Sequence, residues 1–160
     1  MFLISALLFT ILLSGQENNN EIGIRGGLTS GVEYRHFFKP DQSGKLLLGY
    51  RNKGFLIHGM YEVHRSDLFP STNQLDFVFG AGIHAGYQKW DKKRVEGQNE
   101  YTDVATRVVG GIDGLLALEY ALGILPLKAG IEIKPFLDFG GEHGFDAIPW
   151  DFAFTLKLQL

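Results

Sequence analysis

The feature that most constrains this chain is a strict alternation of apolar and polar residues over long segments. Between Trp150 and Leu160, large apolar side chains occupy every even position, and polar or small side chains occupy every odd one. The same period of two recurs in segments 75–90, 108–122 and 127–139. Because successive side chains of a β-strand point to opposite faces, this pattern predicts an all-β protein.

The alternating segments are too long for the strands of an ordinary soluble domain. They run from 11 to 16 residues, whereas strands of soluble proteins are usually about 5 to 6 residues long. A tilted strand that crosses a bilayer needs roughly 9 to 11 residues. Lipid cannot hydrogen-bond the backbone, so a sheet that spans a membrane must close on itself. We therefore expect an antiparallel up-and-down transmembrane β-barrel, with apolar side chains toward lipid and polar side chains inside.

Composition and charge agree with a barrel and argue against several other classes. The chain has 21 Gly, 13 Phe and 6 Tyr; glycine disfavours helices, and aromatic residues suit strands. Because the chain has no Cys, it has neither a disulfide scaffold nor a thiolate metal site. A net charge of −3 without a basic patch argues against a nucleic-acid partner.

Aromatic residues near the ends of the expected strands fit the interfacial belts of membrane barrels. These residues are Tyr34, Phe38, Trp90, Tyr120, Phe139 and Trp150.

The N-terminus carries a short apolar run that is typical of an export signal. Residues 2–13 are almost all apolar, and a Ser-Gly pair that suits cleavage follows them. The run is too short for a spanning helix, which needs roughly 20 residues, and it matches the apolar region of a signal peptide, although no Lys or Arg precedes it. We predict a signal peptide at 1–15, a flexible leader at 16–20 and a β-barrel domain at 21–160. The alternative is a buried N-terminal helix of a soluble protein.

Turn-forming segments divide the chain into strands. They lie at 40–44, 52–54, 66–73, 91–103, 123–126 and 140–149, and we expect 91–103 to be a long, charged, irregular loop. Six turns give seven strands, whereas single-chain outer-membrane barrels normally have an even number. A further turn at 29–31 gives strands near 21–28 and 32–38 and an eight-stranded barrel. With that split, the 91–105 connection and the 140–149 loop lie outside the cell, and the C-terminus lies in the periplasm.

Five segments carry a resemblance to a known family. They are IGIRGGLTSGVEYRHF (22–37), GMYEVH (59–64), FGAGIHAGY (79–87), GIDGLLALEY (111–120) and KPFLD (134–138). The chain resembles the small outer-membrane β-barrel proteins common in Bacteroidetes-type bacteria. The resemblance implies a barrel fold and the outer membrane of a Gram-negative bacterium, and little about chemistry. Such barrels usually end in an aromatic residue, whereas this chain ends in Leu160, which implies weaker recognition by the assembly machinery.

We expect the inward face to form a mutually neutralising network of charges. An eight-stranded barrel is only wide enough for its own side chains, and buried charges need partners. The predicted members are Arg35, His58, Glu62, His64, His84, Asp113, Glu119, Glu132, Lys134 and Asp138. The same face also holds Arg25, Glu33, Lys128 and Lys157. A filled interior of this kind implies no open pore.

Two specific kinds of site, a metal site and a hydrolase active site, remain possible. His58, Glu62 and His64 alternate on one strand face and could ligate a metal, although their spacing requires help from a neighbouring strand, which His84 could give. A hydrolase needs Ser or Thr beside His and a carboxylate, and Ser66 and Asp67 lie close to His64 in the sequence.

The sequence therefore predicts a small outer-membrane β-barrel protein with a structural or partner-docking role and no cofactor or metal. Its expected partners are outer-membrane lipid and other outer-membrane proteins, which would bind through loops 91–105 and 140–149. The alternative function is a membrane-embedded hydrolase that modifies lipid. A soluble lipocalin-type barrel is a third hypothesis, but it would place apolar residues inside and polar residues outside, the reverse of the expected arrangement.

Overall fold

The computed structural model describes residues 19–160 except 69–70, 73, 97–98, 124 and 141–143, and it describes no side chains in 90–104. The described part is almost entirely antiparallel β-sheet, with one short 3-10 turn, η1 (Ser66–Leu68). The strands are β1 (Asn20–Gly27), β2 (Ser30–Lys39), β3 (Gln42–Arg51), β4 (Gly54–Arg65), β5 (Leu75–Glu96), β6 (Asn99–Ala121), β7 (Leu127–Ile133), β8 (Phe136–Phe139), β9 (Phe145–Ile148) and β10 (Phe152–Gln159).

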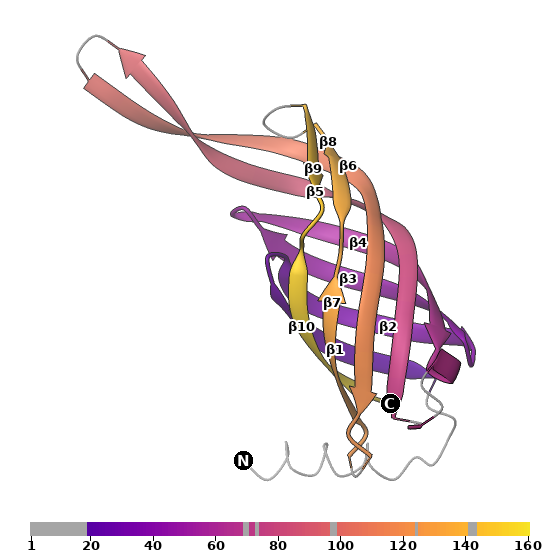
Figure 1. Cartoon of the computed structure of the whole chain (residues 1–160). Helices are drawn as coiled ribbons and strands as arrows, with labels where there is room; N and C mark the ends of the chain where they lie inside the picture. Colours follow the sequence, from indigo (N-terminus) through magenta and orange to yellow (C-terminus); the bar gives the residue numbers. More distant parts are fainter. Residues whose placement is uncertain (1–18, 69–70, 73, 97–98, 124, 141–143) are drawn as a thin grey trace, which may run out of the picture.

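The sheet closes on itself because β1 pairs with both its sequence neighbour β2 and the last strand, β10 (Figure 1). The ring then runs through consecutive strands from β2 to β7, and β7 pairs with β10. Because β8 continues β7 and β9 continues toward β10, the ten strands build a closed barrel of eight antiparallel strands. The predicted eight-stranded up-and-down barrel is confirmed. The added turn is also confirmed, since β1 ends at Gly27 and β2 begins at Ser30.

Two breaks mark the later strands. Between β7 and β8, Pro135 has no N–H to donate, but its carbonyl accepts a hydrogen bond from the Gly114 N–H at 2.7 Å. Between β9 and β10 the pairing shifts by one residue, because Ile133 lies opposite Phe152 whereas Phe136 lies opposite Ile148. A single extra residue of this kind is a β-bulge, which bends the strand.

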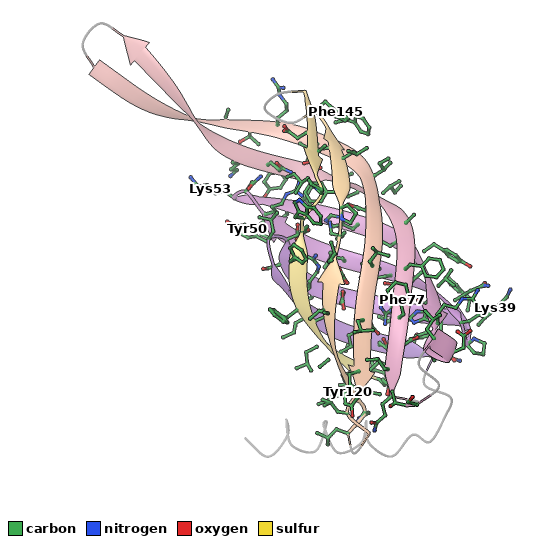
Figure 2. All side chains as sticks on the ribbon, viewed as in Figure 1. Lys39, Tyr50, Lys53, Phe77, Tyr120 and Phe145 are labelled. Atoms are coloured by element: carbon green, nitrogen blue, oxygen red, sulfur yellow. The ribbon has the colours of Figure 1, made fainter. Side chains whose placement is uncertain are left out.

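The side chains follow a polarity opposite to that of a soluble protein. Ile24, Ile83 and Phe154 point outward and are 58%, 68% and 76% exposed, respectively. The interior is filled mainly by buried charged side chains. It also holds a small apolar cluster, formed by Met60, Val78, Leu115 and Ala117. Figure 2 shows Tyr50 and Lys53 at one end of the barrel, and Lys39 and Tyr120 toward the other.

The prediction of an irregular loop at 91–103 is wrong. The ladder between β5 and β6 continues past Asp91, opposite Val104, to Glu96, opposite Asn99. The two strands form a ribbon that projects from one end of the barrel (Figure 1). A two-stranded ribbon in water needs no apolar face, so the alternation that marks the barrel strands disappears while the backbone pairing persists.

Three other expected turns are tested. At 52–54, Asn52 and Lys53 both have positive φ angles, 49° and 54°, as a tight hairpin turn requires, so that prediction is confirmed. At 40–44 the turn is shorter than predicted, because β3 already begins at Gln42. The 140–149 segment is not all loop, since β9 pairs with β8.

The N-terminal predictions fall mostly outside the described residues. The signal peptide at 1–15 and residues 16–18 of the leader lie there, and Asn20 is already the first residue of β1. Among the described residues, no helix has the length and apolar character to span a membrane.

Candidate functional site

Most of the buried charged side chains of the chain lie in the barrel interior. Arg35 lies at the centre of one half of this interior. Its guanidinium contacts three carboxylates: Glu21 at 2.8 Å, Glu62 at 2.6 Å and Glu119 at 2.8 Å. These residues come from β2, β1, β4 and β6, and each is at most 1% exposed. Alternation along each strand points the four side chains inward, so one arginine joins opposite walls of the barrel.

Two lysines extend this cluster. Lys45 Nζ lies 3.2 Å from Glu62 and 2.7 Å from Glu132, and Lys157 Nζ lies 2.5 Å from Glu119. Glu62 and Glu119 thus each contact two cations. Such contacts offset the cost of removing the charges from water.

A second cluster surrounds Asp113 in the half nearer the ribbon. His58 Nδ1 lies 2.8 Å from Asp113 Oδ2, and His84 Nδ1 lies 3.1 Å from Asp113 Oδ1. Lys134 Nζ lies 3.3 Å from the same Oδ1 atom. On the other side of the His84 ring, Nε2 lies 2.7 Å from Asp138 Oδ1.

The two clusters are linked through Asp151. Lys134 Nζ lies 3.4 Å from Asp151 Oδ2, and Arg25 contacts both Asp151, at 3.2 Å, and Glu132, at 2.8 Å. The ion pairs therefore run along the interior without a gap between the two halves.

A third arrangement lies at the barrel end where β1 begins and β10 ends. Ser43 Oγ lies 2.8 Å from His64 Nε2, and His64 Nδ1 lies 2.8 Å from Asp76 Oδ2. Ser43 is fully buried, and its hydroxyl also donates to Glu62 at 2.9 Å. This is a Ser–His–Asp chain with the nitrogen assignments found in serine hydrolases.

The structure places all ten residues predicted for the interior network inside the barrel. Arg35, Glu62, Glu119 and Glu132 meet in the first cluster, His58, His84, Asp113, Lys134 and Asp138 meet in the second, and His64 lies in the third arrangement. Each of the ten is at most 5% exposed.

The residues that the sequence suggested for a metal site and for a hydrolase site are grouped differently in the fold. Glu62 binds Arg35 and Lys45, and His64 binds Asp76, whereas His58 binds Asp113. Within the described residues, the group with metal-binding geometry is His58, His84 and Asp113. The hydrolase set of His64, Ser66 and Asp67 is also wrong, because Ser66 donates to Asp76 and Asp67 is exposed.

Sequence reasoning missed several interior residues. Lys45 and Arg51 lie on β3, where Leu46, Leu47 and Leu48 are apolar on both faces, so the inward face could not be assigned. Glu21 and Asp151 could have been found, because they are in phase with inward residues of β1 and β10. The role of the Ser43 hydroxyl could not be predicted, because its partners Glu62 and His64 come from another strand.

The interior ion pairs are unequal in charge. Among the described residues that form them, the cations are Arg25, Arg35, Lys45, Arg51, Lys128, Lys134 and Lys157. The carboxylates are Glu21, Glu33, Glu62, Asp76, Asp113, Glu119, Glu132, Asp138 and Asp151. Nine carboxylates therefore face seven lysines and arginines, and neutral histidines leave an excess of two negative charges.

Comparison with known proteins yields a structural likeness and no sequence match. No protein-family model and no curated protein matches the sequence. The fold is similar to the N-terminal β-barrel domain of OprF from Pseudomonas aeruginosa, with 14% sequence identity, 88% of this chain and 95% of that chain covered, and a TM-score of 0.47. The likeness concerns the fold and carries nothing on function.

Replacing Arg35 by Met tests the interior network. The substitution leaves Glu21, Glu62 and Glu119 with fewer partners in a buried site, so we expect the free energy of unfolding to fall by about 3–5 kcal/mol. Urea unfolding of the folded protein in detergent measures the change. Lys39→Met is the matched control, because Lys39 lies on the same strand but is exposed, and its effect should stay within about 0.5 kcal/mol. An Arg35→Met protein as stable as the parent would contradict a structural role for the network.

Proposed function

We propose that the chain is a small outer-membrane β-barrel protein of a Gram-negative bacterium, with a structural or partner-docking role and no open pore. The observation that carries this proposal is the inverted polarity of the barrel. Large apolar side chains cover its outside, and ion pairs fill its inside. Water would leave the outer surface exposed as one large apolar patch, whereas lipid covers it. The export signal at 1–15 and kinship with Bacteroidetes-type barrels belong to the same proposal.

The filling of the interior supports the proposed absence of a pore. The Arg35 guanidinium reaches carboxylates on three other strands, so it occupies the space that an ion path would need. An eight-stranded barrel leaves room for little more than its own side chains. Both points support a structural protein rather than a channel.

The β5–β6 ribbon and the β8–β9 hairpin support a docking role. Both project from the same end of the barrel (Figure 1). The sequence of 91–103 carries both acidic and basic residues, among them Asp91, Lys92, Lys93 and Glu96. A paired ribbon holds such residues in a fixed register, which suits recognition of another outer-membrane protein through charge complementarity.

Localisation and conductance test this proposal together. The full chain, produced in a Gram-negative host, should fractionate with the outer membrane and migrate differently on a gel before and after boiling, as folded barrels do. The purified protein should give no stepwise current in a planar bilayer in which a porin control does. Recovery in the soluble periplasmic fraction would contradict the membrane location, and a unitary current would contradict the filled interior.

A ribbon variant tests docking separately. Asp91 and Val104 lie opposite each other, so an Asn-Gly turn can replace residues 92–103 and join them directly. The variant should keep the folded gel mobility and lose partners that crosslink to the parent in native membranes. An unchanged crosslinking pattern would remove the ribbon from the proposal.

A second candidate function is a serine hydrolase acting on lipid acyl chains, and the Ser43–His64–Asp76 arrangement favours it. In that reaction the Ser43 Oγ atom attacks an ester carbonyl, and His64 takes the hydroxyl proton and returns it to the leaving alcohol; water then releases the acyl group. The burial of Ser43 and its bond to Glu62 argue against the reaction.

Labelling with a fluorophosphonate separates the two functions. The structural proposal predicts no labelling of the folded protein. Labelling that is lost in Ser43→Ala and kept in Ser66→Ala would establish the hydrolase instead, because both serines contact the same His–Asp pair but only Ser43 reaches the His64 nitrogen.

A further inference from the structure

The His84 ring lies between two carboxylates, and a neutral ring cannot satisfy both. Its Nδ1 atom lies 3.1 Å from Asp113, and its Nε2 atom lies 2.7 Å from Asp138. A neutral imidazole carries one N–H and one lone pair, so one of these contacts would set a lone pair against a carboxylate oxygen. A second proton on the ring, a proton on one of the two carboxyl groups, or a metal ion at Nδ1 would each relieve that contact.

His58 completes a donor set of the kind that transition metals bind. It lies directly opposite His84 in the pairing of β4 with β5, and its Nδ1 atom lies 2.8 Å from the second oxygen of Asp113. One donor atom from each of the three residues lies within 4.8 Å of the others, and all three residues are buried. The Nε2 atom of His58 is buried without a hydrogen-bond partner. Two imidazoles and a carboxylate are ligands typical of zinc.

The neighbouring strands make room for this cluster. His58, His84 and Asp113 come from the adjacent strands β4, β5 and β6, so the barrel wall itself sets their spacing. Gly111 lies opposite His84, and a Cβ atom there would come within 2.6 Å of the ring. The glycine therefore allows the His84 side chain to turn into the interior toward Asp113.

Charged side chains from neighbouring strands also contact this cluster. Arg51 Nη2 lies 2.5 Å from Asp138 Oδ2. Lys134 is the charged group that competes for Asp113, at 3.3 Å, but it also lies 3.4 Å from Asp151 and can remain paired there.

We propose that His58, His84 and Asp113 form a binding site for one zinc ion, with Asp138 holding the second nitrogen of His84. Zinc bonds to nitrogen and oxygen at about 2.0–2.2 Å in tetrahedral geometry, which sets ligand atoms roughly 3.4 Å apart. His58 and His84 contact different oxygens of Asp113, at 2.8 and 3.1 Å, and one donor atom from each residue lies within 4.8 Å of the others, so side-chain adjustment would bring them to these separations. A carboxylate hydrogen-bonded behind a ligating histidine fixes its ring orientation. Asp138 Oδ1 lies in that place, 2.7 Å from Nε2, although the two atoms do not have hydrogen-bond geometry in the present side-chain positions. The site is independent of the proposed function.

Zinc titration of the full chain without added histidines tests the proposal. After treatment with a chelator and removal of free metal, the folded protein in detergent should bind one zinc per chain in competition with a chromophoric chelator. His58→Gln and His84→Gln should abolish the binding, and Asp138→Asn should weaken it about 10- to 100-fold. His64→Gln is the matched control and should bind as the parent does, because His64 lies in the other half of the interior. Gel mobility before boiling checks that each variant folds.

Histidine ¹⁵N NMR of the unmutated protein gives a readout that needs no variant. The chain has five histidines, and zinc should shift the Nδ1 resonances of two of them and leave those of the other three unchanged. A site that takes up no stoichiometric zinc, or a His84 ring that stays protonated on both nitrogens in the presence of zinc, would overturn the proposal.

Discussion

The ladder between β1 and β10 is the contact on which the rest of the structure depends. It joins the first and last barrel strands over seven residue pairs, from Glu21 opposite Gln159 to Gly27 opposite Ala153. Closure removes the open sheet edge, so no backbone donor along these strands is left facing an apolar surrounding. It also creates an enclosed interior, and that enclosure is why the charged face of each strand must find partners within the chain.

The charged side chains of the interior are paired through bridging contacts, in which one group meets several partners, rather than as isolated ion pairs. Arg35 meets three carboxylates, and Asp113 meets two histidines and a lysine. Buried ion pairs add little stability compared with apolar packing, but an unpaired member costs several kcal/mol. The network therefore selects one strand register, since a shift by one residue would turn every inward charge toward the outside.

The fold could be predicted from the sequence wherever one face of a strand is apolar and the other is not. That condition holds for the segment that contains β10, and it also gave the inward direction of Arg35 and Asp113. The condition fails at Leu46–Leu48, where both faces of the strand are apolar. It also fails in the 91–103 ribbon, where neither face needs to be apolar. Contacts across the interior were beyond sequence reasoning, because Arg35 and Glu119 are 84 residues apart and meet only through closure. The opposition of His58 and His84 likewise depends on the register of the β4–β5 pairing, which their sequence positions do not set.

Contacts between lipid acyl chains and side-chain methyl groups test the central claim most directly. With the protein in lipid nanodiscs, NMR cross-relaxation should link acyl-chain protons to the outward methyl groups of Ile24, Ile83 and Leu156, which are 58%, 68% and 42% exposed. The inward methyl groups of Leu47 and Leu115, at 0% and 2% exposure, should show none. Lipid contacts at Leu47 and Leu115, with none at the three outward residues, would contradict a barrel that turns its apolar face to the membrane and keeps its charges within.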